Sequence, residues 1–70
     1  MTAPVKRALV RRTDEKAIEF GEIAFEGNFG NASEAAIISG LTWQAMGQRE
    51  IGDFEIEIEG KVVLRSVATG

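Results

Sequence analysis

Residues 54–65 have the sequence FEIEIEGKVVLR, and this stretch contains the clearest secondary-structure pattern of the chain. Phe54, Ile56 and Ile58 alternate with glutamates, as in a strand that has one buried and one solvated face. Gly60 then separates this strand from a second apolar run, which predicts a hairpin.

The hairpin has two candidate registers. A two-residue turn at Glu59-Gly60 would suit the glycine. A three-residue loop would instead place Val62 and Leu64 on the apolar face of the first strand. Because the buried face normally sets the register of a strand pair, we favour the three-residue loop.

The first half of the chain carries a second, less regular strand pattern. Residues 5–12 mix apolar and basic side chains and predict a strand that ends at the polar cluster 13–15. Residues 17–26 also alternate, but the parity of the alternation changes across Gly21. Gly21 is therefore either a bulge within one strand or a break between two strand pieces. The two segments predict an N-terminal hairpin, followed by a loop over residues 27–31.

A helical pattern separates the two hairpins. Asn31 is the expected N-cap, with Glu34 three residues later, and residues 32–46 suit a helix. A break near Gly40 and an end at Gly47 are both compatible with the pattern. The apolar face predicted for this helix is formed by Ala35, Ile38, Ala45 and Met46, and it is widened by Ile37 and Leu41.

The expected fold class is therefore α+β. We predict a small two-layer domain (ββαββ) in which a central helix packs on an antiparallel sheet of two hairpins. A chain of 70 residues suits a single domain over residues 1–70, with flexible ends at residues 1–4 and 68–70. Its apolar runs are far shorter than the ~20 residues of a membrane span, and its N-terminus lacks the apolar segment of a secretory signal. These features, with the absence of cysteine, favour a soluble, cytoplasmic protein.

The composition argues against an enzyme. Histidine, cysteine and tyrosine are absent, which removes the most versatile acid–base groups and nucleophiles. Residues 27–31 lack both the lysine of a P-loop and a full GxGxxG pattern. The alternate acids of residues 53–59 would lie roughly 6.5–7 Å apart on a strand, too far apart to share one metal ion. We expect no catalytic residue, no cofactor and no metal site.

One segment resembles the helix-turn-helix family. Residues 35–46 are AAIISGLTWQAM, and Ala36, Gly40 and Met46 stand where that family has a small residue, the turn glycine and an apolar residue. The resemblance implies a DNA-binding protein whose C-terminal hairpin is a wing. The DNA-contacting residues would then be Thr42, Trp43, Gln44 and Gln48 on the second helix, and Lys61 and Arg65 on the wing. Because glutamates on the same wing would repel phosphates, we expect a nucleic acid not to be the partner.

The distribution of charge suggests a protein partner instead. The net charge is −3, with +3 over residues 1–16 and −6 over residues 17–70. The candidate partner-binding residues are Asp53, Glu55, Glu57 and Glu59 on the C-terminal hairpin, and Glu22 and Glu26 on the N-terminal one. A negative sheet face of this kind attracts basic surfaces and speeds association with them. Alternatively, the glutamates only keep the sheet soluble and guard its edges.

In size and charge the chain resembles the small acidic α+β proteins found among phage-encoded inhibitors of host defence, including anti-CRISPR proteins. The resemblance implies a non-catalytic protein-binding module that occludes a basic, nucleic-acid-binding surface of a host complex such as a CRISPR–Cas effector. A structural subunit of a homo-oligomer is a further hypothesis, because Phe29 and Trp43 do not both fit easily into so small a core. The partner and the oligomeric state stay open at this level.

Overall fold

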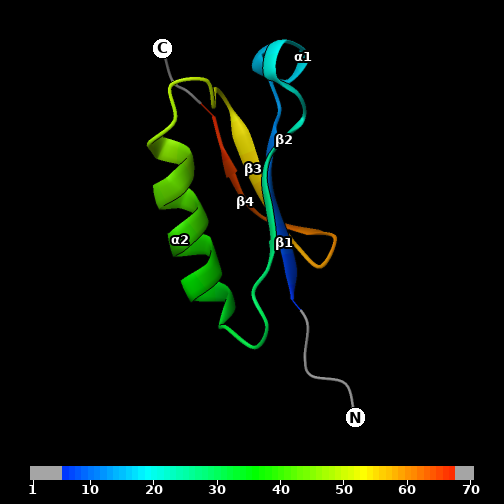
Figure 1. Ribbon diagram of the computed structural model, residues 1–70, viewed down its shortest axis with the longest axis vertical. Helices are drawn as coiled ribbons and strands as arrows, with labels where there is room; N and C mark the ends of the chain where they lie inside the picture. The colour runs from blue at the N-terminus through cyan, green and yellow to red at the C-terminus, as the bar shows by residue number, and fades with distance from the viewer. Residues whose placement is uncertain (1–5, 68–70) are drawn as a thin grey trace.

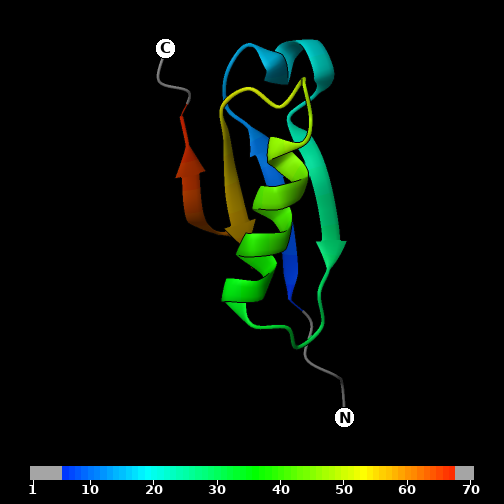
Figure 2. The same cartoon turned by 90° about the vertical axis from the view of Figure 1, so that its left-hand side faces the viewer.

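A computed structural model describes residues 6–67 and confirms the predicted α+β architecture, in which one long helix covers one face of a four-stranded antiparallel sheet (Figures 1 and 2). In chain order the elements are β1 (Arg7–Arg12), α1 (Lys16–Phe20), β2 (Ile23–Asn28), α2 (Glu34–Met46), β3 (Phe54–Ile58) and β4 (Lys61–Ser66). The strand start expected at residue 5 and the flexible ends expected at residues 1–4 and 68–70 lie outside the described residues.

The strand order of the sheet is β2-β1-β3-β4, so the two hairpins are joined through their first strands. β1 and β3 run antiparallel at the centre, with Val10 opposite Ile56. β2 and β4 form the two edges, and Figure 2 shows α2 crossing in front of the sheet. This order places the strand that carries several arginines next to the strand that carries the alternating glutamates.

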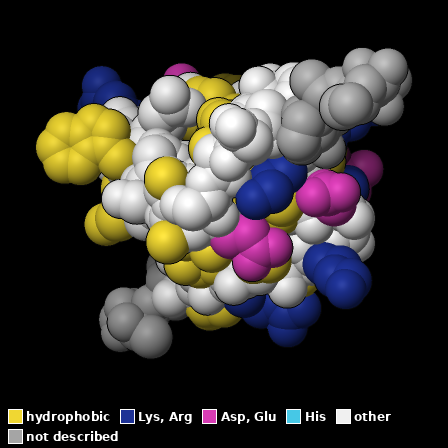
Figure 3. All heavy atoms as spheres, turned by 90° about the horizontal axis from the view of Figure 1, so that it is seen from below, with side chains coloured by type: hydrophobic (Ala, Val, Ile, Leu, Met, Phe, Trp, Pro, Cys, Tyr) yellow, Lys and Arg dark blue, Asp and Glu magenta, His cyan; other side chains and the backbone are white. Residues whose placement is uncertain are grey.

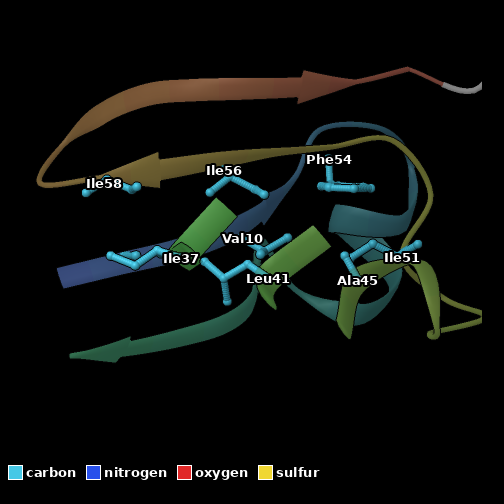
Figure 4. Packing of buried hydrophobic residues seen from close by; sticks show 9 residues of the cluster. Val10, Ile37, Leu41, Ala45, Ile51, Phe54, Ile56 and Ile58 are labelled. Atoms are coloured by element: carbon cyan, nitrogen blue, oxygen red, sulfur yellow. The ribbon is translucent and has the colours of Figure 1, made fainter. Parts of the chain in front are cut away.

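The hydrophobic core lies between α2 and the facing side of the sheet. Val10 and Ile56 are fully buried, and Figure 4 shows them next to Leu41 of α2. Burial of each such side chain contributes about 1.5–3 kcal/mol. The buried apolar residues are Ala8, Val10, Ile37, Leu41, Ala45, Ile51, Phe54, Ile56 and Ile58. The alternation predicted for residues 54–58 is thus confirmed.

The strand expected over residues 17–26 is wrong in its first half, where the chain forms the short helix α1. The carboxylate of Asp14 accepts a hydrogen bond from the backbone N–H of Lys16 (2.9 Å), which favours a helical turn at this point. Gly21, with φ of +99°, then ends α1, and β2 begins two residues later. The break expected at Gly21 is present and the bulge is not, but the break separates a helix from a strand and not two strand pieces. Strand β2 also continues to Asn28, into the region expected to be a loop.

The helix α2 begins later than expected and has no break. Its N-cap is Ser33, whose hydroxyl accepts a hydrogen bond from the backbone N–H of Ala36 (3.2 Å), whereas Asn31 lies in the preceding turn. The helix continues through Gly40 and is capped by Gly47. Residues 34–46 therefore form one continuous helix, and the helix-turn-helix that the resemblance implied does not form.

The buried face of α2 is formed by Ile37, Leu41 and Ala45, at successive i, i+4 positions. Ala35 and Met46, which the sequence assigned to the core, are exposed. Apolar residues occur on all sides of this helix, so helical periodicity does not select the face that is buried.

The hairpin between β3 and β4 has a two-residue turn, so the three-residue loop is wrong. Glu59 and Gly60 have φ of 52° and 81°, as in a type I′ turn. A bulge at Val63 then changes the register: Val62 lies opposite Glu57, but Leu64 lies opposite Ile56. The bulge allows the tight turn and still returns Leu64 to the core side of the sheet.

Candidate protein-binding surfaces

The sheet face turned away from α2, here called the outer sheet face, collects most of the acidic residues that the sequence singled out. Its residues alternate with the core residues along each strand. It is formed by Arg7, Leu9 and Arg11 of β1, Ile23 and Glu26 of β2, Glu55 and Glu57 of β3, and Val62 and Arg65 of β4, with Glu22 beside it.

Arg11 lies at the centre of this face and binds three glutamates. Its Nε donates to Glu57 Oε2 at 2.8 Å and lies 3.9 Å from Glu55 Oε1, while its Nη1 donates to Glu22 Oε1 at 3.0 Å. The hydrogen bond to Glu57 is the largest of several contributions that raise the pKa of the Arg11 guanidinium. The side chains of Glu55 and Glu57 are each only 14% exposed.

A second arginine closes the network from the other side, because Arg65 Nε lies 3.6 Å from Glu55 Oε2. The outer sheet face thus sets three arginines (Arg7, Arg11 and Arg65) against four glutamates (Glu22, Glu26, Glu55 and Glu57). Opposite charges on facing strands stabilise a sheet as cross-strand pairs. The structure therefore brings four of the six predicted acidic residues together on this face, and arginines pair with three of them, Glu22, Glu55 and Glu57.

The remaining acidic candidates lie apart from this network. Within residues 6–67, Glu26 and Glu59 form no ion pair, and both are exposed. Asp53 precedes β3, where its backbone N–H donates to Asp14 Oδ2 and its carbonyl accepts from the N–H of Thr13, each at 2.9 Å. The backbone of Asp53 thus joins the start of β3 to the end of β1.

The residues expected to contact DNA do not share one surface. Trp43 and Gln44 are exposed on α2, whereas Arg65 lies opposite Glu55 on the outer sheet face, on the other side of the sheet from α2. Thr42 on α2 and Gln48 beyond it are half-buried, and Lys61 is exposed at the start of β4.

The solvent side of α2 is an apolar surface. Trp43 is 82% exposed and Met46 is 75% exposed, and together with Gly47 they line a shallow hollow. We call this surface the α2 outer face; its residues are Ala36, Ser39, Gly40, Trp43, Met46 and Gly47, all of them exposed. Residues 35–48 include no charged side chain. Figure 3 shows apolar side chains gathered on the α2 side of the molecule and many of the charged ones on the opposite side.

Phe29 and the short helix α1 carry the other apolar side chains considered for an interface. Phe29 packs against the core, so only Trp43 remains of the two aromatics considered for a subunit interface. On α1, Ile18 is 90% exposed, but the ring of Phe20 is approached by the cations of Lys16 (5.6 Å) and Arg12 (5.8 Å). The sequence identified Trp43 as a candidate but placed its neighbour Met46 in the core.

Within residues 6–67, no cluster of three or more histidine, cysteine, aspartate or glutamate side chains is arranged to hold a metal ion. None of the helices in this range is long and apolar enough to span a membrane. No protein-family model matches the chain, and neither a curated protein nor a solved structure shows significant similarity to it.

Proposed function

We propose that this chain is a non-catalytic protein-binding module that binds its partner through the α2 outer face. The observation that supports the proposal is the exposure of Trp43 beside Met46 on a helix face without charges. Tryptophan is enriched among the residues that dominate binding energy, and methionine adapts to irregular partner surfaces.

The packing behind this face favours binding. Ile37, Leu41 and Ala45 fasten the opposite side of the same helix to the core. Trp43 is therefore presented from a rigid element, and association does not have to order the backbone that carries it.

Occlusion of a basic host surface in the cytoplasm, as by phage-encoded inhibitors, is a second hypothesis, and the net charge of −3 supports it. Such a role requires carboxylates that a partner can reach. Because Glu55 and Glu57 are bound by Arg11 and Arg65, the role would fall mainly on Glu26 and Glu59. We therefore assign the main contact to the α2 outer face.

The test is affinity capture from a lysate of the source cells with tagged wild type, Trp43→Gln and a matched control, Ile18→Gln. Both variants replace an exposed apolar side chain with the same polar one, but Ile18 lies on α1. We expect Trp43→Gln to lose at least about tenfold of the partner retained by wild type and by Ile18→Gln. Equal retention by Trp43→Gln would contradict the proposal. A loss confined to a Glu26→Gln, Glu59→Gln double variant would favour occlusion of a basic surface.

A further inference from the structure

We infer that the occupant of the α2 outer face is a second copy of this chain, packed with its α2 antiparallel to the first about a twofold axis near Ser39 and Gly40. The inference rests on the proposed binding function of that face and names its partner. Three observations carry it: the distribution of side-chain size along α2, the setting of Gly40, and the absence of charge.

The α2 outer face divides into a half with small side chains and a half with large ones. Ala36, Ser39 and Gly40 lie toward its N-terminal end, and Trp43 and Met46 lie toward its C-terminal end. A twofold axis between positions 39 and 40 places Trp43 of each copy across from Ala36 of the other. The large half of one copy then fills the small half of the other, as an isologous interface requires.

Gly40 has no structural role within the monomer that requires glycine. Its φ is not positive, it lies inside a regular helix, and a Cβ built on it meets nothing within 4 Å. Glycine in a helix interior is less favourable than alanine by about 1 kcal/mol. A close approach by the backbone or by a large ring of a second copy is a physical reason for a glycine at this point.

The absence of charge on this face favours a partner surface that is also uncharged. A partner with charged groups at the contact would lose their hydration without gaining counter-charges from residues 35–48. Two copies of a chain with a net charge of −3 repel each other, and the α2 outer face is a side on which they can meet without opposing carboxylates. Since a helix of 13 residues is only about 20 Å long, we expect a contact smaller than a standard interface and association in the micromolar range.

The first experiment is sedimentation velocity over a concentration series from low micromolar to high micromolar. We expect the mass of wild type to rise from 7.6 kDa toward twice that value. Gly40→Gln should stay monomeric throughout. At a concentration where wild type is also monomeric, its thermal unfolding temperature should not be lower than that of wild type, because glutamine is a better helix former than glycine. Trp43→Gln should weaken the dimer at least tenfold, and the control Ile18→Gln should dimerise as wild type does.

The second experiment tests the antiparallel arrangement. The chain lacks cysteine, so a single introduced cysteine reports one position. Ser39→Cys lies near the proposed axis and should form a disulfide-linked dimer with oxidised glutathione. Gly47→Cys lies at the end of the helix, where φ of −81° accepts a side chain, and it should not form one. Linking of both variants would indicate a parallel pair and overturn the arrangement.

The outcomes separate this inference from the proposed function. A wild type that remains monomeric overturns the dimer, and a Gly40→Gln variant that dimerises like wild type shows that the copies do not meet at Gly40 and overturns the inferred interface. If Trp43→Gln nevertheless loses a captured partner that Ile18→Gln retains, the α2 outer face still binds protein and only the identity of the occupant is wrong. If Trp43→Gln affects neither self-association nor capture, both proposals fail.

Discussion

At the scale of single residues, the carboxylate of Asp14 holds together the junction of β1, α1 and β3. One oxygen accepts the backbone N–H of Lys16 and the other accepts the N–H of Asp53, both at 2.9 Å. These hydrogen bonds lower the pKa of Asp14 below its ordinary value of 3.8, and the bond from Asp53 has the largest effect. Gly52 makes room for this carboxylate, because a Cβ at position 52 would come within 2.5 Å of Asp14 Oδ2.

The lowered pKa of Asp14 predicts a pH-dependent contribution to stability. A carboxyl group with a lower pKa in the folded state stabilises the fold fully above its unfolded pKa, and this stability is lost as the pH falls through 3.8 toward the folded value. Wild type should therefore melt at a higher temperature than Asp14→Asn at neutral pH, and the gap should narrow below pH 3.8. Thermal unfolding from neutral pH to below pH 3.8, with Glu26→Gln as the control, measures this difference in unfolding temperature. A difference that does not change with pH would contradict the prediction.

Gly52 and Gly40 provide a matched pair of alanine substitutions. Gly52 has φ of +63° and no space for a Cβ, so Gly52→Ala should destabilise the fold by about 1–3 kcal/mol. Gly40 lies in a helix with open space around it, so Gly40→Ala should stabilise the monomer by about 1 kcal/mol. Chemical denaturation of both variants under conditions that keep the chain monomeric measures the two changes. If Gly52→Ala and Gly40→Ala changed the free energy of unfolding by the same amount in the same direction, the predicted difference between the two glycines would be wrong.

At the scale of elements, the accuracy of the sequence-based prediction depends on how many residues carry each pattern. The strict alternation over residues 54–58 predicts the central strand β3 and its buried face correctly. The five residues of α1 are too few for periodicity to separate a helix from a strand, and Ile18 and Phe20 mimic a strand there. For the hairpin turn, Gly60 predicts the two-residue turn correctly, whereas the apolar pattern of residues 62–64 favours the wrong register. The pattern misleads because it does not reveal the bulge at Val63.

The ion pairs between β1 and β3 predict that Glu57 contributes to the fold itself. Glu57→Lys would place a second cation beside the Arg11 guanidinium, which lies 2.8 Å from the present carboxylate. We expect a lower thermal unfolding temperature for Glu57→Lys than for Glu26→Lys, because Glu26 forms no ion pair within residues 6–67. Glu57→Gln removes the carboxylate without adding a cation beside Arg11, so it should lower the unfolding temperature less than Glu57→Lys does. Equal unfolding temperatures for the two lysine variants would show that the pair contributes little.

At the scale of the whole molecule, the sheet presents few surfaces suited to association. Both edge strands depart from regular pairing, since the register of β2 shifts opposite Val10 and Arg11 and that of β4 shifts at Val63. Bulges at sheet edges discourage pairing with a further strand. The acidic face expected from the sequence is neutralised because β1 and β3 are neighbours, and that long-range pairing is not visible in either strand alone. Trp43 could be identified as a candidate from its residue type, but its exposure depends on which face of α2 is buried.

The same arrangement predicts that the protein does not bind duplex DNA. Residues 34–46 form one helix, and Arg65 lies on the opposite side of the sheet from Trp43, so no recognition helix and wing converge on one groove. Arg11 and Arg65 are also paired with glutamates, which leaves fewer cations to replace the counterions of the phosphates.

Because Trp43 is the only tryptophan and is 82% exposed, its fluorescence reports contact with α2 directly. Titration with mixed-sequence duplex DNA at low salt should leave the emission unchanged at micromolar DNA. A saturable change that fades as salt is added would show that this face binds DNA without a helix-turn-helix.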